Sequence, residues 1–376
     1  MPRKKTPADS DADPKAAKKA ATKKSKTPAK TPARRSFPGL SPRAYEHPSD
    51  RAALVALRKV PGFDFAVRKL FGFIGDRSLR LAFLASAVRV SEDQFPEVHA
   101  KYLEACSVLD VSPPPELYVA QTPIVNAGAI GIDEPFIVIN SGTLLLTDPD
   151  ELQFILAHEL GHVLSEHVLY KTMIRLMLRM TLIAMAVPLG GAALFAILAA
   201  LLEWDRKSEL SADRAGLLVV QDPDVAYRAH MKLAGGGQTQ QMSVDAFLAQ
   251  AEEYKGGGSV VDGVVKLLNL LGRTHPFPVL RLAELKGWVD GGDYARILDG
   301  DYPTRDADPE VSVLDELKRG GAAYADDFES SPDPLMGFVR DVRREVVGGA
   351  KNVATGARDF ASRFRRKDRD EDGPEA

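Results

Sequence analysis

Two histidines and a glutamate lie close together in the stretch Ala157–His162, which reads Ala-His-Glu-Leu-Gly-His. On a helix, residues four apart share a face, so His158 and His162 would present two imidazoles to one metal ion. Glu159 lies on the adjoining flank, where its carboxylate would reach a water at that metal. This spacing is typical of zinc peptidases. The competing interpretation is a solvated helix face that carries two histidines.

A catalytic zinc site needs a third protein ligand and leaves its fourth position to water. Glu209 is the candidate, in the stretch Ser208–Ala215. Asp213 follows one helical turn later on the same face. A carboxylate at such a position typically accepts a hydrogen bond from the far nitrogen of a ligand histidine and fixes its tautomer. An exposed acidic helix face is the alternative, but apolar neighbours such as Leu210 and Leu217 favour the ligand interpretation.

The composition sets limits on the fold and on the metal site. The chain has 376 residues, 45% of them hydrophobic, which suggests one or two domains plus tails. Its single cysteine, Cys106, excludes an intrachain disulfide framework and a cysteine-rich zinc site, and it fits a reducing compartment. Basic residues open the chain without an apolar run behind them before residue 37, so we expect no secretory signal and a cytoplasmic location.

The two ends of the chain are basic. Residues 1–37 are rich in Lys, Ala, Pro and Thr, so we expect a disordered tail. It would contact an anionic membrane surface or only solvate, and without interleaved aromatic residues no specific nucleic-acid binding is expected. Residues 335–376 predict a basic amphipathic helix and a charged tail, suited to a membrane surface or a partner. Their glycines leave a loosely ordered tail as the alternative.

Between the ends, the patterns divide the chain into three parts. Residues 38–112 predict a helical N-terminal segment, residues 113–290 the metal-binding domain, and residues 291–334 a loop-rich segment. We expect a short helix near Val311–Lys318 in the last of these, and the helix Val279–Trp288 at the end of the domain.

Inside the domain, two strands are predicted before the metal motif, at Glu116–Ala120 and Phe136–Asn140. The small residues Asn126–Ala129 between them permit close approach of another backbone. A turn is expected at Ser141-Gly142. Thr147-Asp148-Pro149 predicts the start of a helix that runs through the metal motif and continues well beyond it.

An uncharged run of 23 residues, Met180–Leu202, separates the histidine motif from Glu209. Its length suits a membrane span, but Pro188–Gly191 should break the helix. A single crossing would also put Glu209 on the opposite side of the membrane from His158. We therefore predict a helical hairpin at about residues 173–204. Whether its tip is buried in protein or enters a bilayer stays open, and Arg175 with Arg179 disfavours full spanning.

Taken in order, these motifs resemble the gluzincin metallopeptidases, a group that includes the HtpX-like membrane proteases and the CAAX prenyl proteases. The likeness runs from about Leu117 to Leu285. The motifs that carry it are Asn126-Ala127, Ile139-Asn140-Ser141-Gly142, His158–His162, Glu209 with Ala212-Asp213, and Thr274-His275-Pro276 with Arg281. The resemblance implies an α+β, mainly helical fold: a zincin-like catalytic domain with a small β-sheet, an active-site helix and an apolar helical hairpin between the metal ligands.

The resemblance also implies roles for individual residues. His158, His162 and Glu209 would hold one Zn²⁺, with Glu159 as the catalytic base. The strand Phe136–Asn140 would be the sheet edge along which the substrate backbone lies. The residues expected to bind substrate are Asn126, Ala127, Ile137 and Ile139.

Two further residues of the resemblance keep alternative roles. His275 would steady the oxyanion or occlude the metal at rest, or else only order its loop. Arg281 would pair with an acidic group near the site or simply anchor its helix. The other histidines fit no ligand spacing and are expected to be structural or exposed: His47, His99, His167 and His230.

We therefore predict a zinc metalloendopeptidase that acts on protein or peptide substrates, in protein quality control at or near the cytoplasmic face of a membrane. The HtpX-like and CAAX proteases have spanning segments that this chain lacks before the metal motif, so we do not expect prenyl-peptide processing. The alternative is a non-catalytic membrane-associated scaffold that keeps a structural zinc site. Glu159 argues against that alternative, because a structural site needs no base.

Overall fold

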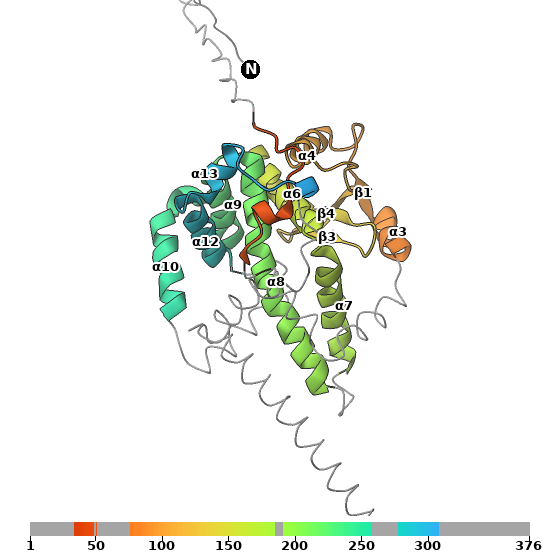
Figure 1. Cartoon of the computed structure of the whole chain (residues 1–376). Coiled ribbons are helices and arrows are strands. Elements are labelled where there is room, and N and C mark those ends of the chain that lie inside the picture. Colours follow the sequence, from red (N-terminus) through yellow and green to blue (C-terminus); the bar gives the residue numbers. More distant parts are fainter. Residues whose placement is uncertain (1–33, 49, 51–75, 185–190, 257–276, 308–376) are drawn as a thin grey trace, which may run out of the picture. The chain divides into compact units, whose positions relative to one another are not determined.

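The computed structural model describes residues 34–48, 50, 76–184, 191–256 and 277–307 (Figure 1). Several predictions fall outside these residues: most of the N-terminal tail, the hairpin turn, His275, the helix at Val311–Lys318 and the segment 335–376. The boundary of the predicted tail is wrong by a few residues. Phe37, expected in the tail, is 1% exposed and packs in the main core.

Four strands form one sheet in the order β1-β2-β4-β3. Their bounds are Ala87–Arg89 for β1, Leu117–Ala120 for β2, Ala127–Ile130 for β3 and Phe136–Asn140 for β4. Strands β2 and β4 are parallel, and the other two pairs are antiparallel. The predicted strands at 116–120 and 136–140 are confirmed. The prediction that 136–140 forms a sheet edge is wrong, because β4 lies between β2 and β3. Among the described strands β1 and β3 are the two edges, and β3 is the edge beside β4.

Helices make up most of the rest, which confirms the predicted α+β, mainly helical class. They are α3 (Asp76–Ser86), α4 (Pro96–Val108), α5 (Ser141–Leu146), α6 (Pro149–Leu164), α7 (Val168–Ala184), α8 (Gly191–Val220), α9 (Pro223–Gly235), α10 (Val244–Gly256), α12 (Pro278–Asp290) and α13 (Asp293–Leu298). Two short helices form where the sequence predicts a turn and a loop. Helix α5 begins at the expected turn, and α13 lies in the expected loop-rich segment.

Helix α6 is the central element, and its start follows from local chemistry. Asp148 caps it by accepting from the backbone N–H of Glu151, whose side chain in turn accepts from the N–H of Asp148. Pro149 occupies the first turn, where its missing N–H is harmless. The predicted continuation past the metal motif is wrong: the helix ends at Leu164, and Glu166 adopts a positive φ of 56° before α7 begins.

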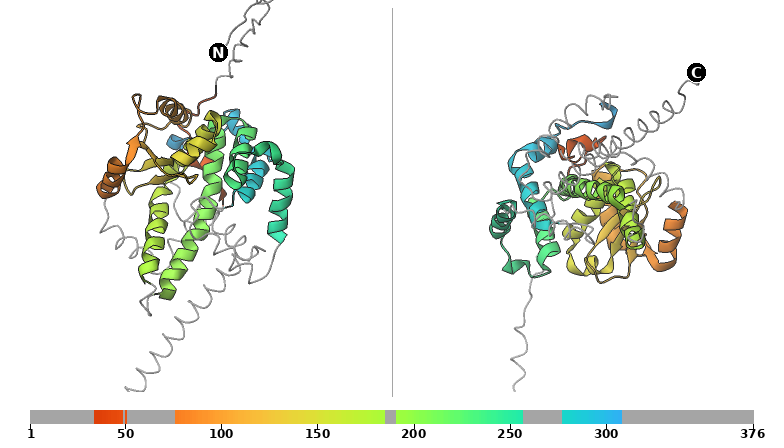
Figure 2. Two further views of the ribbon diagram at one scale, coloured as in Figure 1. Left: turned by 180° about the vertical axis from the view of Figure 1, so that it is seen from behind. Right: turned by 90° about the horizontal axis from the view of Figure 1, so that it is seen from below.

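Helix α8 packs along α6 and also contacts α7, so the chain returns as the hairpin prediction requires. Figure 1 shows α7 and α8 side by side, and Figure 2 shows the sheet on one side of α6 and α8, with α9, α10 and α12 on the other. Within the described part of the chain, no helix combines the length and hydrophobicity that a membrane crossing needs.

The contact between α6 and α8 is unusually close at Gly161. A Cβ at this position would lie 2.7 Å from the Cβ of Ala215 and 3.2 Å from the Cα of Ala212. The missing side chain of Gly161 therefore sets the separation of the two helices. Gly161 lies within one helical turn of His158 and His162, and Ala212 lies within one turn of Glu209.

Candidate active site

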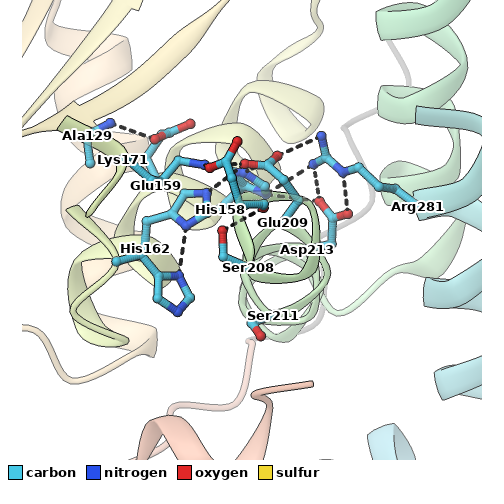
Figure 3. Close-up of polar contacts among 12 residues, drawn as sticks. Ala129, His158, Glu159, His162, Lys171, Ser208, Glu209, Ser211, Asp213 and Arg281 are labelled. Carbon is cyan, nitrogen blue, oxygen red and sulfur yellow. Dashed lines mark hydrogen bonds and ion pairs between the residues drawn. The ribbon is translucent and has the colours of Figure 1, made fainter. Parts of the chain in front are cut away.

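His158 and His162 project from α6 toward Glu209 on α8 (Figure 3). The Nε2 atom of His158 lies 3.5 Å from Glu209 Oε2, and Nε2 of His162 lies 3.2 Å from Glu209 Oε1. One donor atom from each of the three residues falls within 4.8 Å of the others, and all three residues are buried. Two imidazole nitrogens and a carboxylate form a donor set that suits zinc, so these residues fit the metal that the sequence implies.

A buried acid and an arginine support the His158 side of the site. Asp213 Oδ1 lies 2.9 Å from Nδ1 of His158, which leaves Nε2 to face Glu209. Arg281 donates to both oxygens of Asp213, at 2.8 and 2.5 Å, and its third nitrogen lies 2.9 Å from Glu209 Oε2. His230 Nε2 lies 3.1 Å from Asp213 Oδ2. Arg281 thus pairs with acidic groups of the site rather than only anchoring its helix.

These contacts shift the protonation of both partners. Burial raises the pKa of Asp213, but the charges of Arg281 and His230 outweigh it and hold that pKa well below its usual range. Burial lowers the pKa of His158, yet hydrogen bonds to Asp213 and Glu209 dominate and raise it to about 9 in the metal-free protein. In the metal-free protein at neutral pH, the imidazole of His158 therefore carries hydrogens on both ring nitrogens and a positive charge.

A second histidine supports the His162 side. Nδ1 of His162 lies 3.0 Å from Nδ1 of His167, and Nε2 of His167 lies 3.1 Å from Oδ2 of Asp50. Burial, followed by the charge of Lys171, holds the pKa of His162 well below its ordinary value. The imidazole of His162 is therefore neutral, as a metal ligand must be.

Lys171 on α7 brings a cation to the same carboxylate. Its Nζ donates to Glu209 Oε1 and to Asp205 Oδ1, each at 2.6 Å, in a fully buried position. Burial lowers the pKa of Lys171, but the two carboxylates outweigh burial and raise it. Lys171 and Arg281 thus bring one cation to each oxygen of the Glu209 carboxylate.

Glu159 lies between these groups and the edge strand β3. Its Oε2 accepts a hydrogen bond of 2.8 Å from the backbone N–H of Ala129 on β3. The carbonyl oxygen of Ala129 accepts a hydrogen bond of 2.6 Å from Nη1 of Arg175 on α7. Gly128 makes room for that arginine, since a Cβ there would lie 2.6 Å from its Nη2. The edge strand therefore contacts both the active-site helix and α7.

Comparison with known proteins decides the family. The sequence model of peptidase family M48 matches residues 92–289. The plastoglobule-localized metallopeptidase 48 of Arabidopsis thaliana is 36% identical over 268 residues, which cover 70% of this chain and 77% of that protein. The chain belongs to peptidase family M48. It is therefore a metalloendopeptidase that acts on proteins or peptides, and the resemblance to HtpX-like enzymes is confirmed.

Two further M48 relatives are more distant. The protease HtpX homolog 1 of Streptomyces coelicolor is 31% identical over 211 residues, covering 49% of this chain and 69% of that protein. The protease HtpX homolog 2 of Methanosarcina mazei is 25% identical over 170 residues, covering 39% and 58%. No solved structure matches the chain.

The structure corrects part of the expected substrate site of this M48 enzyme. Ile137 and Ile139 are fully buried in the main core, and their strand is internal, so neither side chain can reach a substrate. Asn126 and Ala127 lie instead at the start of the edge strand β3, where Asn126 O accepts from the N–H of Asn140.

Sequence reasoning missed four polar residues of the M48 site: Asp50, Lys171, His167 and His230. His167 is predicted from the sequence to be structural or exposed, because it fits no ligand spacing on a helix. That argument fails because α6 ends between the two residues and the chain turns back. The other three come from separate elements, and no local pattern connects them with the metal motif.

Proposed function

We propose that this M48 peptidase uses one Zn²⁺, held by His158, His162 and Glu209, and that Glu159 is its catalytic base. The observation that carries the proposal is the convergence of two imidazoles and a carboxylate in a buried site, with a further carboxylate fixed beside it against a strand edge. Bound zinc would act as a Lewis acid and lower the pKa of a water toward neutrality.

The protein's own groups prepare each proposed ligand. Asp213 accepts the Nδ1 hydrogen of His158, so the proton that the ring would give up to bind a metal is the one on Nε2, and the freed lone pair would face inward. Lys171 and Arg281 fix the carboxylate of Glu209, whose side chain would otherwise be able to rotate. Such bonds reduce the reorganisation that metal binding requires.

Glu159 would take the proton of the attacking water and deliver it to the leaving amine. The hydrogen bond from Ala129 orients its carboxylate without adding a charge. Because that hydrogen bond comes from the edge strand β3, it fixes the position of Glu159 relative to a substrate strand that pairs with β3.

We infer that the substrate backbone pairs with β3 near Asn126 and Ala127, by addition of a strand to this edge of the sheet. An extended peptide there would lie beside Glu159. Arg175 already binds one outward carbonyl of this edge, at Ala129, so a peptide must compete with it.

The cellular role that we propose is quality control of proteins at the cytoplasmic face of a membrane, with peripheral attachment. The basic residues of segment 1–35 and the apolar arms of α7 and α8 support attachment, as does the name of a relative that is localised to plastoglobules. Fractionation of cells into membrane and soluble pools, with a salt wash, tests it. Recovery only in the soluble pool would contradict attachment.

The Glu159→Gln variant tests the chemistry, because it removes the base and keeps the shape of the side chain. We expect casein cleavage to fall by about 10²–10⁴-fold while the zinc content measured by mass spectrometry stays at one per chain. Glu166→Gln, an exposed glutamate just past the motif, is the matched control and should keep full activity. Retained activity in Glu159→Gln would refute the assignment, and another metal in the purified protein would refute zinc.

A further inference from the structure

Asp50 is a buried carboxylate that lies outside the region matched by the family model, which begins at residue 92. It is 1% exposed. Burying an ionised carboxylate is costly unless hydrogen bonds replace its water. Here Trp204 Nε1 donates to Oδ1 at 3.0 Å, and Ser211 Oγ donates to Oδ2 at 2.6 Å. The hydroxyl of Ser211 accepts from the N–H of His47, so its own hydrogen is directed to Asp50.

The third partner of Asp50 leads to the metal site. Nε2 of His167 lies 3.1 Å from Oδ2 of Asp50, and Nδ1 of His167 lies 3.0 Å from Nδ1 of His162. The three side chains are all buried, so water does not compete for these bonds. They form a continuous path from the carboxylate of Asp50 to the imidazole of His162.

Only one placement of hydrogens along this path lets His162 bind a metal through Nε2. That nitrogen must carry a lone pair, so the hydrogen of the neutral ring is on Nδ1 and is donated to His167. His167 must then accept at Nδ1 and carry its own hydrogen on Nε2, which donates to Asp50. With the opposite placement, Nε2 of His162 would be blocked by a hydrogen, and a lone pair of His167 would face the carboxylate.

We propose that Asp50 is a positioning residue for the metal ligand His162 and acts through His167. Its negative charge selects the hydrogen on Nε2 of His167, and this selects the metal-binding tautomer of His162. The inference rests on the proposed zinc site. It makes the segment before the family-matched region a part of the active site.

The same carboxylate also connects the two helices of the site. Trp204 and Ser211 belong to α8, which carries Glu209, whereas His167 follows the end of α6 directly. Asp50 therefore holds the turn after α6 against α8. Its charge orients His162 through His167, and its hydrogen bonds to α8 fix the helix that carries Glu209.

The test replaces Asp50 by Asn in the full-length protein, which removes the charge and keeps the shape. We expect the zinc dissociation constant, measured by competition with a chromophoric chelator, to rise about 10–100-fold. Nitrogen-15 NMR of the metal-free protein should show a larger share of the His162 hydrogen on Nδ1 in the wild type than in the variant. Glu209 Oε1, 3.2 Å from Nε2, favours the other tautomer equally in both proteins. Tyr45→Phe is the matched control: it removes a buried hydrogen bond of the same segment, from Ser165, away from the path. Its zinc affinity and its tautomers should equal those of the wild type.

The inference is overturned if Asp50→Asn binds zinc within about twofold of the wild type and leaves the His162 tautomer unchanged. If Asp50→Asn does not fold, His167→Phe replaces it, because it keeps the ring packed on Trp204 and breaks the path. It should lose zinc affinity and change the His162 tautomer equally, and an unchanged tautomer would again overturn the inference. If the wild type binds no zinc, the zinc proposal fails, whereas the tautomer in the metal-free protein still decides the role of Asp50.

Discussion

Replacing Gly161 by Ala tests whether the close approach of α6 and α8 sets the geometry of the metal site. The added Cβ would lie 2.7 Å from the Cβ of Ala215, whereas carbon atoms in contact are normally about 3.5 Å or more apart. The helices must therefore separate by roughly 0.8 Å. Neither atom belongs to a flexible side chain, so rotation cannot relieve the contact.

The stability effect combines two opposing contributions. Overpacking a core typically lowers the free energy of unfolding by about 1–3 kcal/mol. Replacing Gly by Ala within a helix raises it by about 1 kcal/mol, because Ala has the higher helix propensity. We expect Gly161→Ala to lose about 0–2 kcal/mol of unfolding free energy, because the first contribution outweighs the second. Gly287→Ala in α12 is the matched control. A Cβ there meets no atom within 4 Å, so this variant should gain about 1 kcal/mol.

The effect on the metal should be larger than the effect on stability. Zinc–ligand distances tolerate changes of only about 0.2 Å, so moving Glu209 away from the two histidines should weaken zinc binding at least about tenfold. Chemical denaturation of the metal-free protein and chelator competition measure the two effects. Ala215→Gly, added to Gly161→Ala, removes the shorter contact and leaves the one of 3.2 Å to the Cα of Ala212, so it should restore most of the zinc affinity. Equal stability gains in Gly161→Ala and Gly287→Ala, with unchanged zinc affinity, would refute the reasoning.

The pKa of His158 is raised to about 9 in the metal-free protein, above its unfolded value of 6.5. Between these two pH values the ring is charged in the folded protein and not in the unfolded one, and it loses this charge as the pH rises through 9. Because the pKa of His162 is depressed, zinc binding at pH 6 should release about one proton, and calorimetry in buffers of different ionisation enthalpy measures it; release of none or two contradicts these charge states. Replacing Arg175 by Ala removes the competitor for the Ala129 carbonyl. The KM for an extended peptide should then fall, by up to about tenfold, with kcat little changed. A KM that rises or stays constant would show that Arg175 does not obstruct the edge.

The parts of the site that could be predicted depend on short-range periodicity. His158 and His162 are four residues apart on a helix, and Asp213 is four residues after Glu209, so helical geometry alone places each pair on one face. The start of α6 follows from Asp148-Pro149 in the same way. Glu209 itself required a chemical argument, the need for a third ligand.

The parts that were missed depend on tertiary packing. Strand β3 reads Ala-Gly-Ala-Ile, in which Ile130 is the single β-branched residue, and no sequence pattern fixes which strand lies at the edge. Helix α6 ends at Leu164, and the chain turns at Glu166, without a glycine or proline to signal the end. Lys171 and Asp50 reach the site because α7 and the N-terminal segment pack against α6 and α8, which no local pattern encodes.

The peptide unit at Ala129 has a consequence for regulation. Its N–H is bound by Glu159 and its carbonyl by Arg175 of α7, so peptide pairing and the docking of α7 draw on the same carbonyl. Competing equilibria of this kind are reciprocal. In the proposed pairing, any agent that holds α7 away from the edge would strengthen peptide binding by a given factor, and bound peptide would strengthen the hold of that agent on α7 by the same factor. A lipid surface that binds the α7–α8 arms would then couple proteolysis to location without touching the metal.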